Sequence, residues 1–125
     1  VTMSKKEFDV LSQLPRYFDV GWARFEFSLV KKLANEEGHD LYGQIDFHNL
    51  VISLADTMKG DLAQSTVIHE CMHGLLETLG LGALDNTDDL TTTNEILTET
   101  TTRASLMFKR LNPELWDLLF VKFYE

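Results

Sequence analysis

The chain has 125 residues, of which 44% are hydrophobic and 25% charged, a composition typical of one globular domain over residues 1–125 and not of a disordered or fibrous protein. Twenty acidic against eleven basic residues give a net charge of -9, which repels phosphate backbones and argues against nucleic-acid binding. Cys71 has no second cysteine to pair with, and neither a leader-like segment nor a long apolar run is present, so we expect a cytoplasmic protein without a membrane span.

The first half of the chain has the pattern of a short helix followed by strands. A capping box at residues 4–7 and apolar residues at helical spacing predict a helix over about residues 5–14. Apolar and polar residues alternate over residues 22–29, which predicts a half-buried strand. Residues 45–47 and 50–54 are apolar runs at hairpin spacing. We therefore expect a three-stranded antiparallel meander, with residues 50–54 as a candidate edge.

The second half has helical periodicity throughout. A second capping box and one apolar stripe predict a helix over about residues 62–79, which Gly80 ends. Another stripe predicts a helix over about residues 93–110, and Pro113 suits the first turn of a last amphipathic helix. The expected fold class is α+β: a small antiparallel three-stranded sheet packed against about four helices, counting the one near the N-terminus.

The segment from His69 to His73 has the pattern H-E-x-x-H inside the predicted helix 62–79. Histidines four residues apart lie one above the other on a helix, so both imidazoles can bind one metal ion, for which we expect Zn²⁺. Glu70 is rotated by about 100° from His69 and can reach a water on that metal instead of the metal itself. The alternative is that the two histidines are unrelated, because a motif this short arises by chance.

A catalytic zinc normally has a third protein ligand, for which the next predicted helix offers Glu95 and Glu99 at positions i and i+4. We favour Glu95 as the ligand, with Glu99 accepting a hydrogen bond from the far nitrogen of a ligand histidine. Glu99 is also the competing candidate for the third ligand. In a purely structural interpretation, Glu95 caps its helix and Glu99 pairs with Arg103.

These segments resemble a family. Residues 68–74, followed by residues 94–99, resemble the gluzincin metallopeptidases, with Glu99 where aspartate is usual. More of the chain, over about residues 22–115, resembles the small phage and prophage proteins of the ImmA/IrrE-like metallopeptidase group. The segments that carry this resemblance are residues 42–46, residues 50–54, the two predicted helices with the metal-site residues, and residues 112–115. The resemblance implies a minimal zincin fold with His69, His73 and Glu95 on zinc and Glu70 as the general base.

The leading hypothesis is a zinc-dependent peptidase whose substrate is a peptide or protein, with Glu70 taking a proton from water and returning it to the leaving amine. A peptide could add to the edge of the strand at residues 50–54. The alternative is a catalytically silent zincin-like protein that binds a host or phage protein.

Five further residues have side chains that could contribute to a metal site. Cys71 lies on the apolar stripe, which predicts a core residue, and Glu77 is expected to be an exposed charge. Tyr42, Arg103 and Tyr124 are candidates to stabilise an oxyanion, but the sequence gives none of them a position near the metal.

Overall fold

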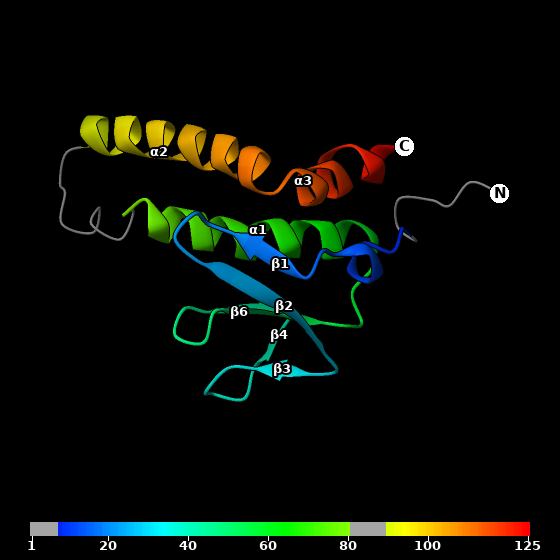
Figure 1. Cartoon of the computed structure of the whole chain (residues 1–125). Helices are drawn as coiled ribbons and strands as arrows, with labels where there is room; N and C mark the ends of the chain where they lie inside the picture. Colours follow the sequence, from blue (N-terminus) through cyan, green and yellow to red (C-terminus); the bar gives the residue numbers. More distant parts are fainter. Residues whose placement is uncertain (1–7, 81–89) are drawn as a thin grey trace.

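A computed structural model describes residues 8–80 and 90–125, with side chains of the second part from Glu95 onward (Figure 1). Strands occupy most of the first half of the chain and helices the second, as the periodicity predicts. The elements are β1 (Tyr17–Asp19), β2 (Arg24–Val30), β3 (Leu33–Ala34), β4 (Asp40–Leu41), β5 (Gly43–Asp46), β6 (Val51–Ala55), α1 (Gly60–Thr78), α2 (Leu90–Leu111) and α3 (Pro113–Phe120), with 3-10 turns at Leu11–Gln13 and Lys122–Tyr124.

The α+β class is confirmed, but the sheet differs from the predicted meander. Four strands pair in the order β1-β2-β6-β5, and β3 pairs with β4 in a separate ribbon. β2 and β6 are parallel, whereas β1 with β2 and β5 with β6 are antiparallel. The prediction of a three-stranded antiparallel sheet is wrong in these respects: β1 is too short to show alternation, and residues 31–50 form the connection that brings β6 back parallel to β2.

The predicted edge strand is an interior strand. β6 is hydrogen-bonded on both sides, and its residues Ile52 and Leu54 are fully buried. The hairpin of β5 and β6 forms as predicted, but β5 occupies the edge of the four-stranded sheet. Ile52 and Leu54 lie on the face that packs on the core, whereas Val51 and Ser53 on the other face are half-buried, so the apolar residues of this strand mark its core-facing side and not an edge.

α1 lies between the sheet on one side and α2 with α3 on the other (Figure 1). The predictions for these three helices agree with the structure to within a few residues at each end. The predicted helix at residues 5–14 is wrong over its described part, where only the 3-10 turn Leu11–Gln13 forms; residues 5–7 lie outside the described chain. Asp9 accepts hydrogen bonds from Ser12 there, a local arrangement that competes with a helix.

The core gathers side chains from the sheet, α1 and the two later helices. α1 contributes Ala63, Val67, Cys71 and Leu75 from one stripe. The largest fully buried side chains are Phe18, Phe25, Phe108, Ile52, Leu54, Leu75, Leu115 and Leu119. Among the described helices, none is long and apolar enough to cross a membrane.

Candidate metal site

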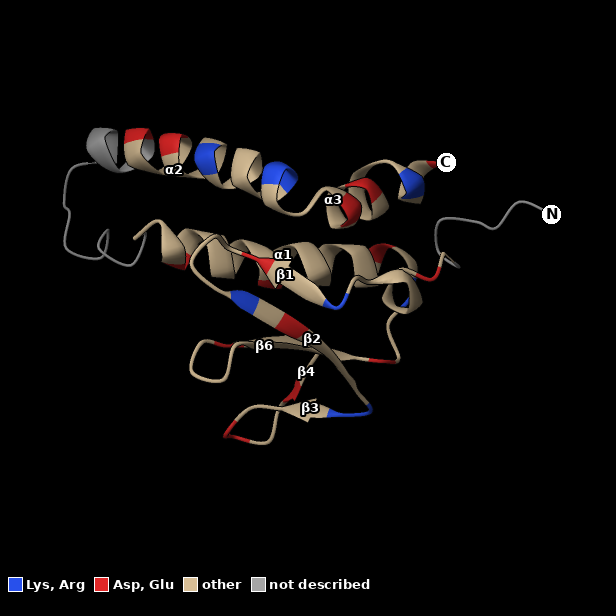
Figure 2. Cartoon of the chain, in the orientation of Figure 1, with Lys and Arg blue, Asp and Glu red and all other residues tan. Residues whose placement is uncertain are grey.

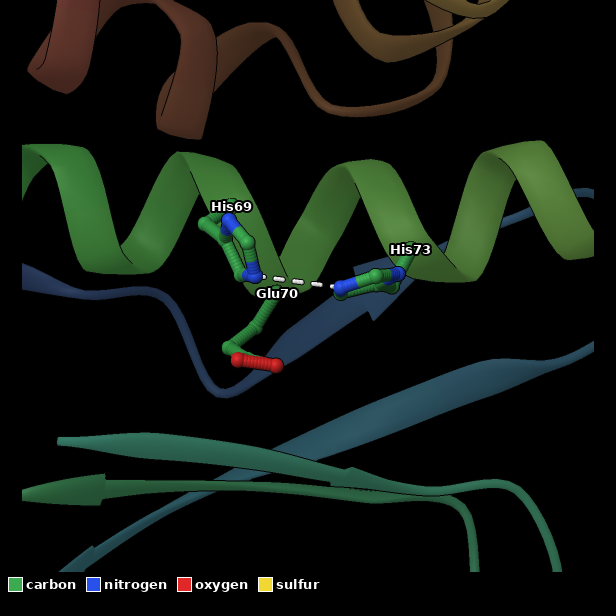
Figure 3. Close-up of side chains that lie close together, drawn as sticks. All are labelled: His69, Glu70 and His73. Atoms are coloured by element: carbon green, nitrogen blue, oxygen red, sulfur yellow. Dashed lines mark hydrogen bonds between the residues drawn. The ribbon is translucent and has the colours of Figure 1, made fainter. Parts of the chain in front are cut away.

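His69 and His73 form a pair on the exposed side of α1 (Figure 3). Their Nε2 atoms are 3.0 Å apart and their ring planes are nearly perpendicular, at 82°. This is the outcome of i, i+4 spacing on a regular helix. A tetrahedral zinc with bonds of about 2.0–2.1 Å separates its ligand atoms by roughly 3.3 Å, so a small opening of the pair would accommodate the ion.

Glu70 completes the group of side chains that could hold a metal ion. Ligand atoms of His69, Glu70 and His73 all lie within 4.8 Å of one another. Figure 3 shows the Glu70 side chain directed toward the strands, while the two imidazoles face each other across one helical turn. A separation within this bound lets the Glu70 carboxylate reach a water on a metal held by the two imidazoles, the role expected for it from the sequence.

The Glu70 side chain is only 6% exposed and makes no hydrogen bond or ion pair with any described residue. No side-chain nitrogen or oxygen in the described chain is both fully buried and unpartnered, so the Glu70 carboxylate opens onto a cavity instead of the core. A buried carboxylate without a protein partner is costly, and a water or a cation in that cavity would compensate the cost.

The edge strand β5 is pressed against α1 at this point. A Cβ atom at Gly43 would lie 2.9 Å from Glu70 Cγ and 2.9 Å from Thr66 Cγ2, closer than side chains tolerate. One turn along, a Cβ at Gly74 of α1 would lie 3.3 Å from Ile45 Cδ1. The absence of a side chain at Gly43 therefore brings the backbone of the sheet edge beside Glu70. The sequence analysis assigned no role to Gly43, because nothing in the local pattern marks this close approach.

Two open cavities flank the histidine pair. One, of about 310 Å³, lies toward the sheet edge, and the other, of about 470 Å³, lies along an apolar row of α1. His69 lines both. The first is lined by Tyr42, Gly43, Ser65, Thr66, His69 and Glu70, and the second by Ser65, Ile68, His69, Met72, His73 and Leu76.

The charge around the pair favours a cation. α1 carries Asp61, Glu70 and Glu77 but no lysine or arginine, as Figure 2 shows. No lysine or arginine is among the described residues that line the two cavities. A metal ion at the pair would therefore meet no opposing side-chain charge from α1 itself.

Glu95 and Glu99 lie apart from this group in the structure. Both are exposed on α2 and line a separate open cavity of about 700 Å³, with no described lining residue from α1. Glu95 is nine positions from the fully buried Ala104, which places the two on roughly opposite sides of the helix. Glu99 accepts a hydrogen bond of 3.0 Å from Arg103, the pairing of the structural interpretation. Glu95 as the third ligand and Glu99 as the hydrogen-bond acceptor for a ligand histidine remain predictions.

The structure also gives the positions of Cys71, Glu77 and the candidates for oxyanion stabilisation. Cys71 is fully buried in the core, as predicted, and burial followed by the nearby Glu70 carboxylate raises the pKa of its thiol well above the usual range. Glu77 is exposed, also as predicted. Of the three candidates for oxyanion stabilisation, Tyr42 is the one that lines a cavity beside the histidine pair.

Comparison with family models, with curated proteins and with solved structures found no match to the chain.

Proposed function

We propose that the protein is a zinc-dependent metallopeptidase of the ImmA/IrrE-like type, with His69 and His73 as metal ligands, Glu70 as general base and Glu95 as the third ligand. The observation that carries the proposal is the combination on α1 of two imidazole nitrogens 3.0 Å apart with a buried carboxylate, within 4.8 Å of them, that has no hydrogen-bond partner among the described residues. A structural metal site would not need a carboxylate aimed at an open cavity.

The donor set fits zinc. Two imidazoles and a carboxylate are borderline to hard ligands that zinc accepts, and the pair is open to solvent on one side, as a catalytic site requires. When bound, zinc would lower the pKa of a coordinated water and polarise a carbonyl group. Glu70 would accept the proton from that water and return it to the leaving amine.

The substrate would bind along β5. This strand is the edge of the sheet and lies beside Glu70, so its outer backbone groups are the nearest available for pairing with an extended peptide. β6, which the sequence favoured for this role, is paired on both sides. A peptide paired with β5 would run past the cavity that His69 and Glu70 line.

One observation favours the alternative of a zincin-like protein that binds a partner without hydrolysis. The described metal-binding group lies entirely on α1 and contains two of the three predicted ligands, because Glu95 on α2 is not part of it. A site with two imidazoles alone would hold zinc weakly and would leave the ion without the three protein ligands usual for catalysis.

Elemental analysis of protein purified without added metal tests the proposal, with His69→Ala and Glu70→Gln prepared alongside the wild type. We expect about one zinc per chain in the wild type and in Glu70→Gln and a sharp loss in His69→Ala. Hydrolysis of a peptide mixture by the zinc-loaded protein should then fall by about 10²- to 10⁴-fold in Glu70→Gln. Absence of zinc from the wild type, with no rise in melting temperature on zinc addition, would overturn the metal site.

A further inference from the structure

Tyr42 is placed at the site by the bend between β4 and β5. Its carbonyl accepts a hydrogen bond of 2.8 Å from the Ala55 backbone N–H of β6, so the backbone at this position is held by the sheet. The side chain is 56% exposed and lines the cavity of about 310 Å³ together with His69 and Glu70. Because residue 42 lies in a bend outside the regular strand, its direction is not bound by the alternation of β5.

The chemistry of that cavity lacks one component of a hydrolytic site. The described lining supplies the His69 imidazole, which is suited to bind a metal, and the Glu70 carboxylate, which is suited to accept a proton. Negative charge that develops on a carbonyl oxygen also needs a donor at hydrogen-bonding distance. Among the described residues around this cavity, the Tyr42 phenol is a donor of that kind, and no lysine or arginine competes with it.

We propose that the Tyr42 hydroxyl donates a hydrogen bond to the oxygen of the ligand bound beside the histidine pair, and so stabilises the negative charge that develops on a substrate carbonyl. The assignment rests on the proposed function, because it requires a metal at His69 and His73. The phenol keeps its proton, and no covalent bond is formed or broken by it. Ser65 and Thr66 also line the cavity, but the Ser65 hydroxyl donates a hydrogen bond of 3.2 Å to the Leu62 carbonyl, and Thr66 lies one helical turn before Glu70, in line with the general base and not with the metal ligands.

Tyr42→Phe tests the assignment, because it removes the hydroxyl, keeps the ring and leaves the backbone contact with Ala55 intact. The matched control is Tyr17→Phe, which removes a phenol from β1 at the opposite edge of the sheet. Each protein is loaded with Co²⁺, whose visible absorption reports its coordination, and is then titrated with acetohydroxamate, an anionic metal ligand. The measured quantities are the affinity for Co²⁺, the affinity for acetohydroxamate and the melting temperature.

We expect Tyr42→Phe to bind Co²⁺ as the wild type does and to bind acetohydroxamate about 10- to 100-fold more weakly, the usual effect of losing a hydrogen bond to a charged group. Tyr17→Phe should change neither affinity. Equal acetohydroxamate affinity in Tyr42→Phe and the wild type would overturn the assignment and leave the metal site standing. Failure of the wild type to bind Co²⁺, or equal binding by His69→Ala, would overturn the proposed function and this assignment with it.

Discussion

α1 and α2 carry the residues that the sequence assigns to one metal site, but the fold holds the two helices differently. α1 is packed against β5 and β6 on one side and against α2 on the other (Figure 1). α2 is firmly buried at Ala104 and Phe108, yet Ile96 and Leu97 near its start are 37% and 38% exposed. Ligand geometry is therefore fixed by packing on α1, whereas the first described turns of α2 have few contacts to fix the direction of Glu95.

The largest effect that we expect is the loss of zinc affinity in His73→Ala on α1 and in Glu95→Ala on α2, which tests whether both helices bind the metal. We expect both variants to bind zinc more than about 100-fold more weakly than the wild type, because a catalytic zinc site normally has three protein ligands. For Glu95 this requires the start of α2 to turn toward α1, which its sparse packing permits. A competition titration with a chromophoric chelator measures the affinities.

His48→Ala is the control for that titration, since His48 is exposed in the turn between β5 and β6. Wild-type affinity in Glu95→Ala, with the loss confined to His73→Ala, would show that Glu95 is not a ligand of the metal. The third ligand would then have to be sought elsewhere in the chain.

The contact between β5 and α1 predicts the next largest effect. In Gly43→Ala the new methyl group would lie 2.9 Å from Glu70 Cγ, so the strand or the helix must shift. We expect a loss of about 1–3 kcal/mol in the free energy of unfolding, the usual cost of overpacking. Denaturant unfolding followed by circular dichroism measures it.

Gly74→Ala is the matched control at the same interface. Its methyl group would be close only to the flexible end of Ile45, at 3.3 Å, and would make ordinary contacts with Val20 and Phe18, at 3.6 and 3.7 Å. Alanine also favours the helix over glycine by up to about 1 kcal/mol. We therefore expect little net change in stability. Equal stability of Gly43→Ala and the wild type would mean that the sheet edge is not held against Glu70.

The sequence predicted the helical half of the fold well and the sheet less well, for a physical reason. α1 and the helices after it show a period of 3.6 residues, and this periodicity predicted them even though α1 begins at Gly60, after Lys59, without the predicted capping box. β1 has three residues, and the parallel pairing of β2 with β6 depends on contacts between residues more than twenty positions apart. Such long-range pairing leaves no local pattern that one sequence can reveal.

The candidate site divides in the same way. His69, Glu70 and His73 lie within one helical turn, so spacing alone predicts that they come together. Gly43 and Tyr42 reach the site through the fold of the sheet, which is why the sequence could not place Tyr42, one of three candidates, near the metal and gave Gly43 no role. Glu95 depends on the packing of one helix on another, which the sequence does not specify to within one residue.

A smaller effect is expected at Glu99, which is exposed on α2. Its ion pair with Arg103 joins two side chains that are 70% and 65% exposed, so solvent screens most of the attraction. Glu99→Ala should change the free energy of unfolding by about 0.5 kcal/mol or less. If Glu99 also supports a metal ligand, the same variant will lose zinc affinity by about 10-fold or more while its stability stays unchanged, and wild-type affinity would exclude that support.

The smallest effect concerns the turn that positions β5. Asp46 Oδ1 accepts hydrogen bonds from the backbone N–H groups of Asn49 and His48, at 3.0 and 2.9 Å, and Oδ2 accepts one from the Asn49 side chain. These bonds, the Asn49 backbone first, lower the pKa of Asp46 below its ordinary value. Because the folded-state pKa is the lower one, the stabilisation is present above the ordinary value of about 3.9 and is lost as the pH falls through the folded-state value.

Asp46→Asn should therefore be less stable than the wild type at pH 6, and the difference in melting temperature should shrink toward pH 2. A difference that is constant over this range would show that the charge of Asp46 does not contribute to holding the turn.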